Sequence, residues 1–120
     1  MSVEHASSIL LASDEADNRK RWKAALESAG FAVVQAESRM DALTLLRDAV
    51  SGIDLLVTSV MRDGAGAQLA AEAAELPRAL PVIIVSGYAY PVGVQHGFAN
   101  MLEPVSDAEL IGTARALLAQ

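Results

Sequence analysis

Residues 55–59, Leu-Leu-Val-Thr-Ser, constrain the fold of this chain more than any other stretch. The run is apolar at successive positions instead of alternate ones, and it is bounded by Gly52 before it and by Asp63-Gly64 after it. A short run of this kind indicates a β-strand buried on both faces, as in the middle of a parallel sheet. Because ligands bind at the carboxyl ends of such strands, Ser59 marks the place to look for a functional site.

Similar apolar runs alternate with helical patterns along the rest of the chain. This alternation predicts an α/β fold: a doubly wound, five-stranded parallel sheet in the order 2-1-3-4-5, a flavodoxin-like three-layer α/β/α sandwich. We expect one domain over residues 8–120, after a disordered tail at residues 1–7. The expected strands are 8–12, 31–36, 54–59, 81–86 and 99–102, and the expected helices are 15–29, 39–50, 67–76, 88–98 and 107–118.

Local signals refine this pattern at several helix ends. Asp14 is a candidate cap for the first helix, and Ser106 with Glu109 forms a capping box for the last. Gly64-Ala65-Gly66 does not match a phosphate-binding glycine motif and is interpreted as a flexible loop. The fourth helix, over 88–98, is expected to be short or irregular because it contains one proline and two glycines.

The composition argues against several classes of partner. The net charge is −6, so the chain offers no basic stripe for nucleic acid or for anionic lipid. It has no cysteine, which excludes disulfides and thiolate metal sites. No stretch approaches the ~20 apolar residues of a transmembrane helix, and the first residues do not form a signal peptide. We therefore expect a cytoplasmic protein that binds neither nucleic acid nor membrane.

Taken together, the motifs resemble the receiver domain of bacterial two-component response regulators over residues 8–119. Ile9–Glu15 resembles the family's first strand, which is followed by Asp-Asp-Glu. Asp54–Met61 resembles the third strand, which ends in the phosphoacceptor Asp. Ser86 matches the Ser or Thr after the fourth strand, and Glu103-Pro104 stands where the family has Lys-Pro.

The resemblance also implies what the site has lost. In the family, carboxylates hold Mg²⁺, and the metal and the lysine neutralise the phosphoryl group during its transfer. Here Ser13 replaces the first acid and Ser59 replaces the acceptor. The lysine is either replaced by Glu103 or deleted after it. Asp14 and Ser86 remain, and Asp14 is a weak metal candidate whose alternative role is helix capping. We predict a degenerate receiver, or pseudo-receiver, with no specific metal site and no cofactor.

The chain is therefore expected to be a signalling module of a phosphorelay and not an enzyme, since no base, triad or metal cluster accompanies Ser59. It would act through protein–protein interaction with a sensor kinase or another signalling protein. Two alternatives stay open: phosphorylation at an unusual residue, and small-ligand binding in the vacated crevice. Partner-binding side chains, and a possible homodimer contact, are expected on the face formed by the fourth helix, fifth strand and last helix: Tyr88, Tyr90, Val92, Phe98 and Met101.

Overall fold

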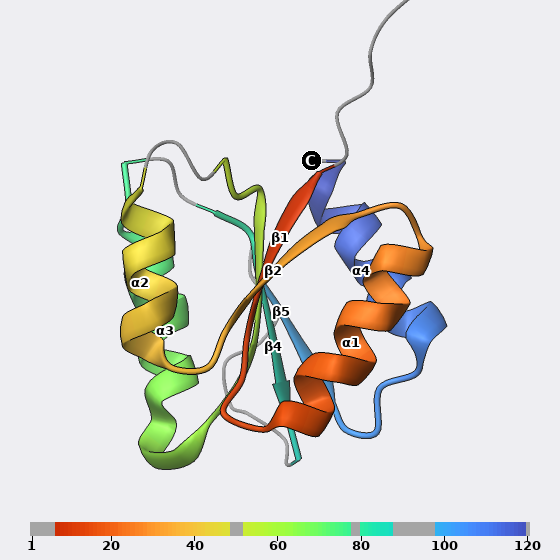
Figure 1. The fold of residues 1–120 in the computed structure, drawn as a ribbon, viewed down its shortest axis with the longest axis horizontal. Helices are drawn as coiled ribbons and strands as arrows, with labels where there is room; N and C mark the ends of the chain where they lie inside the picture. Colours follow the sequence, from red (N-terminus) through yellow and green to blue (C-terminus); the bar gives the residue numbers. More distant parts are fainter. Residues whose placement is uncertain (1–6, 49–51, 78–79, 88–97, 120) are drawn as a thin grey trace, which may run out of the picture.

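The computed structural model describes residues 7–48, 52–77, 80–87 and 98–119, and within them every side chain except those of Asp63 and Phe98. Its centre is a sheet of five parallel strands in the order β2-β1-β3-β4-β5 (Figure 1). This confirms the predicted strand order. The strands are β1 (Ser8–Ala12), β2 (Ala32–Ala36), β3 (Leu55–Ser59), β4 (Val82–Ser86) and β5 (Phe98–Leu102).

The helices form two layers, one on each face of the sheet (Figure 1). Helices α1 (Ala16–Ser28) and α4 (Asp107–Leu118) cover one face, and α2 (Arg39–Arg47) and α3 (Ala65–Ala74) cover the other. The helix expected over 88–98 lies outside the described residues, except that Phe98 begins β5 and does not end a helix. The last helix of the sequence prediction is therefore α4 of the structure.

The sheet separates two apolar cores. Successive strand residues point to opposite faces, so Ile9 and Leu11 pack on the side of α1 and α4, whereas Leu10 and Ala12 pack on the side of α2 and α3. Strands β3 and β4 are buried at every position. Burial on both faces is the reason that their sequences are apolar without alternation.

The described part of the chain begins at Ser7, directly before β1. Ser7, expected in the tail, accepts a backbone hydrogen bond from Ala32 N at 3.0 Å and so is held beside the start of β2, while residues 1–6 lie outside the described part. None of the helices in the described residues is long and apolar enough to cross a bilayer.

The helix starts agree with the sequence at α2 and α4 but not at α1. Ser38 Oγ accepts from Asp41 N at 3.1 Å, and Ser106 Oγ accepts from Glu109 N at 3.1 Å and donates to the Glu109 carboxylate at 2.9 Å. The predicted pairing of Ser106 with Glu109 at the start of α4 is therefore confirmed, with the Glu109 carboxylate bound to the Ser106 hydroxyl instead of to its backbone N–H. Capping of α1 by Asp14 is wrong: the residue at the cap position is Glu15, which makes no side-chain cap.

The glycines after β3 are ordered, which corrects the prediction of a flexible loop. A 3₁₀ turn spans Arg62–Gly64, and α3 begins at Ala65 instead of residue 67. Gly66 N donates to Val60 O at 2.7 Å, and a Cβ on Gly66 would overlap the Ser59 carbonyl oxygen. Gly66 is required because the start of α3 lies directly against the end of β3.

An ion pair joins the two helices of the second layer. Arg39 Nε lies 2.5 Å and Nη2 lies 2.6 Å from the two carboxylate oxygens of Glu72 in α3. This two-pronged geometry is the favourable one for a guanidinium and a carboxylate. The hydrogen bond from Arg39 to Glu72 raises the pKa of Arg39 above its usual value.

Candidate functional site

Three serines stand at the carboxyl ends of the central strands. Ser13 follows β1, Ser59 ends β3 and Ser86 ends β4, and their exposed fractions are 0%, 8% and 5%. Ser59 Oγ donates a hydrogen bond to Ser13 Oγ at 3.1 Å. The structure thus joins directly the two residues that stand, by the family resemblance, at the positions of the first acid and of the phosphoacceptor.

The Ser13 hydroxyl is held by the start of α1 as well as by Ser59. Its oxygen accepts at 3.2 Å from the backbone N–H of Glu15, the residue at the N-cap position of α1. Ser13 N donates to Ala36 O at the end of β2 at 3.2 Å. Ser13 is therefore hydrogen-bonded to the end of β2, to the end of β3 and to the start of α1.

Asp14 makes a contact that the sequence did not predict. Its carboxylate accepts from Arg62 N at 3.0 Å, at the start of the 3₁₀ turn after β3. The bond joins the loop after β1 to the loop after β3, across 48 residues of sequence. Among the described residues, no group of three or more His, Asp or Glu could hold a metal ion. The Asp14 carboxylate is thus used to tie two loops together.

Arg19 is a site residue that the sequence analysis missed. From α1 it donates through Nη1 to Ser13 O at 2.6 Å, and its Nη2 lies 3.7 Å from the Glu37 carboxylate after β2. Its side chain is only 13% exposed. The signal was present in the sequence, because Arg19 stands three residues before Trp22 and seven before Leu26, and so is a cation on the buried face of its helix.

Glu103 and Ser86 lie side by side at the carboxyl ends of β5 and β4. Glu103 N donates to Ser86 O at 2.8 Å, which places Glu103 immediately after β5 and directly before Pro104. An added Cβ on Gly87 would lie 3.6 Å from the Glu103 carboxylate, so this side chain lies along the end of β4. The Glu103 carboxylate therefore lies close to the carboxyl end of β4.

The residues expected to bind a partner are only partly described. Tyr88, Tyr90 and Val92 lie outside the described residues, and of Phe98 only the backbone is described, in β5. Met101 is half-buried and packs on the core formed with α1 and α4. Its neighbour Leu102, which the sequence analysis did not select, is 56% exposed.

Comparison with known proteins identifies the fold and the family together. The model of the response regulator receiver domain matches residues 9–102. The chain belongs to the receiver domain family. A receiver protein from Sinorhizobium medicae WSM419 is 31% identical, with a TM-score of 0.84 and coverage of 95% of both chains. We found no match among proteins of curated function.

Two further receiver structures show how widely this fold is shared. A CheY-like receiver from Methanospirillum hungatei JF-1 is 22% identical, with a TM-score of 0.83 and coverage of 96% of this chain and 95% of the other. The receiver domain of the hybrid histidine kinase CckA is 25% identical, with a TM-score of 0.79 and coverage of 93% and 99%. This receiver domain is therefore a unit of two-component signalling, a family of signalling modules that interact with protein partners such as kinases.

Proposed function

We propose that this receiver domain is not phosphorylated at Ser59 and transmits its signal by binding another protein. The observation that carries the proposal is the buried hydrogen bond between Ser59 Oγ and Ser13 Oγ. Two neutral hydroxyls, bound to each other, occupy the positions at which the family resemblance implies two carboxylates. The usual position of phosphoryl transfer thus has neither the acceptor group nor the first metal ligand.

Ser59 is poorly suited to act as a substitute acceptor. A serine hydroxyl attacks phosphorus only when a base removes its proton, and the hydrogen-bond partner of Ser59 Oγ is another hydroxyl, that of Ser13. Ser13 Oγ is in turn occupied by Glu15 N. The side chains bonded to this hydroxyl pair therefore supply no base.

The charges around the pair are also wrong for a phosphoryl group. Phosphoryl transfer depends on cations that neutralise the moving group, and the resemblance implies a lysine where Glu103 stands. Glu103 adds negative charge at this edge, and the nearby cation Arg19 is bound to Ser13 O and faces Glu37. An incoming phosphate would therefore be repelled by the Glu103 carboxylate, at the position where the resemblance implies an attractive lysine.

The hydrogen bonds at this edge hold one arrangement of the loops without any ligand. The Asp14 to Arg62 bond joins the loops after β1 and β3, and the Ser13 to Ser59 bond joins the strand ends beneath them. A module held in this way presents a constant surface to its partner. The partner is a sensor kinase or another protein of the same signalling pathway.

Labelling with acetyl phosphate and Mg²⁺ tests the proposal. Intact-mass analysis of this domain should show no added phosphoryl group, whereas a receiver domain that has the acceptor Asp and the lysine should gain one under the same conditions. A phosphoryl group located by peptide mapping at Ser59 of the unmodified domain would overturn the proposal, and one at another residue would favour the alternative of phosphorylation at an unusual position.

A further inference from the structure

The open edge of the sheet at β2 lacks the charged residues and the proline that often discourage pairing with another strand. Strand β2 pairs with β1 on one side only. Proteins usually protect such an edge with charged residues, proline or a bulge. The sequence of β2, Ala-Val-Val-Gln-Ala, has no charge and no proline. The edge is therefore able to accept a further strand.

The backbone groups that would pair can be assigned from the hydrogen bonds to β1. Ala32 N donates toward β1, to Ser7 O, and Ala36 O accepts from Ser13 N after β1. In a strand the direction of the backbone groups alternates from one residue to the next. Val33 and Gln35 therefore direct their N–H and C=O groups to the free edge.

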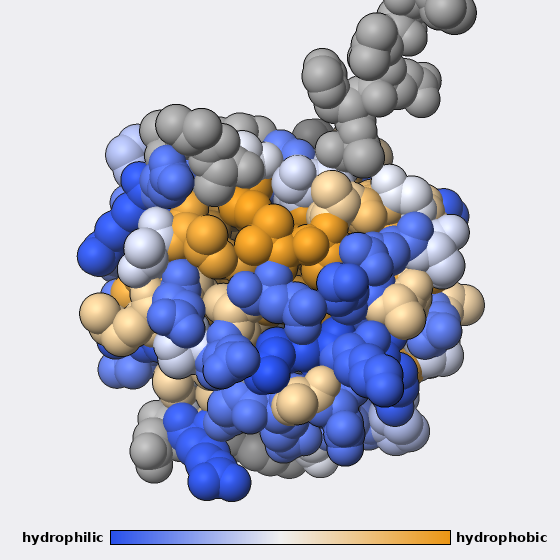
Figure 2. Space-filling view, viewed as in Figure 1, coloured by the Kyte–Doolittle hydropathy of each residue, from blue (hydrophilic) through white to orange (hydrophobic). Residues whose placement is uncertain are grey.

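The surface around this edge is apolar on one side. Figure 2 shows apolar residues gathered over β2 and toward α2, with hydrophilic residues beside and below them. Val34 is 38% exposed, and Leu45 and Leu46 of α2 are half-buried against the core between the sheet and the α2–α3 layer. An added strand would remove part of this apolar surface from water.

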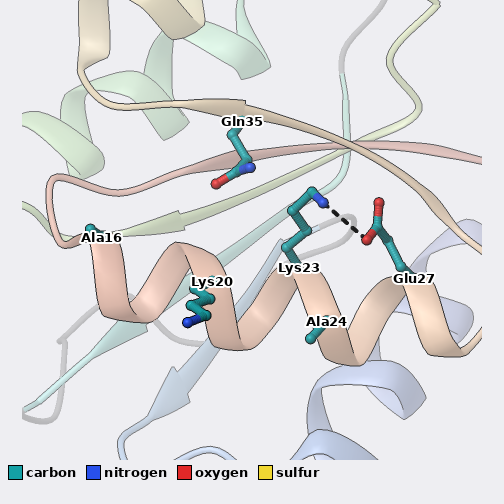
Figure 3. Close-up of a pocket in the computed structure, with 6 residues that line it drawn as sticks. All are labelled: Ala16, Lys20, Lys23, Ala24, Glu27 and Gln35. Atoms are coloured by element: carbon teal, nitrogen blue, oxygen red, sulfur yellow. Dashed lines mark hydrogen bonds and ion pairs between the residues drawn. The ribbon is translucent and has the colours of Figure 1, made fainter.

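The other side of the edge is a hollow between α1 and β2 with a volume of about 340 Å³ (Figure 3). Lys23 is bound to Glu27 at 3.1 Å, so their charges compensate each other. Lys20 makes no hydrogen bond or ion pair within the described part of the chain. Gln35 lines the opposite wall. Lys20, which lines the hollow and is exposed to solvent, thus carries the uncompensated charge beside it.

We propose that β2 binds an extended peptide segment of a protein partner as a sixth strand, with acidic side chains directed into the hollow beside Lys20. Backbone hydrogen bonds to Val33 and Gln35 would supply affinity, and the alternate side chains would supply specificity. The inference rests on the proposed function only in giving the domain a protein partner, and it uses a different surface from the Ser59 site.

A second copy of the chain fits this edge less well than an acidic segment. Symmetric antiparallel pairing of two β2 strands would place both α1 helices on the same face of the joined sheet. The Lys20 side chains of the two copies would then lie on the same side of the junction, where like charges repel. A segment with carboxylates at alternate positions carries the charge opposite to that of Lys20 and is attracted to it.

The test uses two short labelled peptides, one with glutamate alternating with valine and one with lysine alternating with valine. Fluorescence anisotropy at low salt should show saturable binding of the acidic peptide only. Methylation of alternate backbone nitrogens in the acidic peptide should abolish binding, because it removes hydrogen-bond donors and keeps the side chains. No saturable binding at about 1 mM, or equal binding of both peptides, would refute the proposal.

Variants of the domain locate the binding. Gln35→Pro removes an outward N–H, which an edge strand tolerates, and should abolish binding, whereas Gln35→Thr keeps that N–H and should bind. Lys20→Glu should weaken the acidic peptide about fivefold, and Arg115→Glu on α4, with the same change in charge, should not. Binding unaffected by Gln35→Pro and Lys20→Glu would refute the site even if the peptide binds elsewhere.

Analytical ultracentrifugation of the domain without peptide tests whether two copies pair through β2. The acidic-segment proposal expects a monomer over the concentrations used for the peptides. A dimer that Gln35→Pro dissociates would show that β2 pairs with itself and would overturn the proposal. The acetyl phosphate experiment measures phosphoryl groups on the domain, whereas the peptide experiments measure binding at β2. A failure of the proposed function can therefore be distinguished from a failure of the β2 proposal.

Discussion

Replacing Ser59 by aspartate should not restore a working phosphorylation site, and it should destabilise the domain in a pH-dependent way. Ser59 is almost completely buried and bonded to Ser13. The introduced carboxyl would sit in a desolvated position with no lysine, and Asp14 and Glu103 would add negative charge at the same edge. Both effects raise the pKa of the introduced group.

The magnitude follows from this shift. One to two units above the unfolded value of about 3.9 corresponds to about 1.4–2.8 kcal/mol of stability lost at neutral pH. In a domain of this size the unfolding midpoint would fall by about 5–10 °C. Because the folded state then binds the proton more tightly than the unfolded state, the loss is absent below about pH 4 and reaches its full size above the folded pKa.

Thermal unfolding of Ser59→Asp and of its neutral counterpart Ser59→Asn, followed from about pH 4 to pH 7, separates charge from shape. The asparagine variant should carry a similar deficit at every pH, and the aspartate variant should lose further stability only as the pH rises. Acetyl phosphate should label neither. Equal stability of the two variants at pH 7, or efficient labelling of Ser59→Asp alone, would show that the site still accommodates a carboxylate.

Two other predictions concern packing and metal binding. Gly66→Ala should lower the free energy of unfolding, measured by chemical denaturation, by about 1–3 kcal/mol because the added Cβ would overlap the Ser59 carbonyl. Gly112→Ala in α4, where a Cβ meets open space, should raise it by up to about 1 kcal/mol. A change of the same sign in both variants would contradict the packing argument. Mg²⁺ up to about 1 mM should leave the fluorescence of Trp22 unchanged, because Asp14 is bonded to Arg62 N and Ser13 and Ser59 offer no carboxylate; a saturable change would show a metal site.

The sheet could be predicted because its signal is strong and local. Uninterrupted apolar runs such as Leu55–Ser59 specify strands buried on both faces, and right-handed crossovers then leave few strand orders. The site serines could be placed at one edge for the same reason. Their hydrogen bond to each other depends on side-chain geometry between residues 46 positions apart, which no local pattern contains.

The errors have a common cause in tertiary contacts that override local preferences. Asp14 has the chemistry of a helix cap, but its carboxylate finds a donor in a distant loop. Gly64 and Gly66 have the composition of a flexible loop, yet Gly66 is small because a strand carbonyl lies against it. Arg19 was missed because a cation in a helix is usually solvated, whereas here a backbone carbonyl at the end of β1 accepts from it.

The separation of the interior into two cores has a consequence for how such a domain changes over evolution. Each buried apolar residue of the strands belongs to one core only, and the α1–α4 layer and the α2–α3 layer meet the sheet on opposite faces. Substitutions in different cores share no side-chain neighbours, so their effects on stability should add. One layer can therefore diverge toward a new partner while the opposite layer keeps its sequence, and lineages of this domain can change one association without losing another.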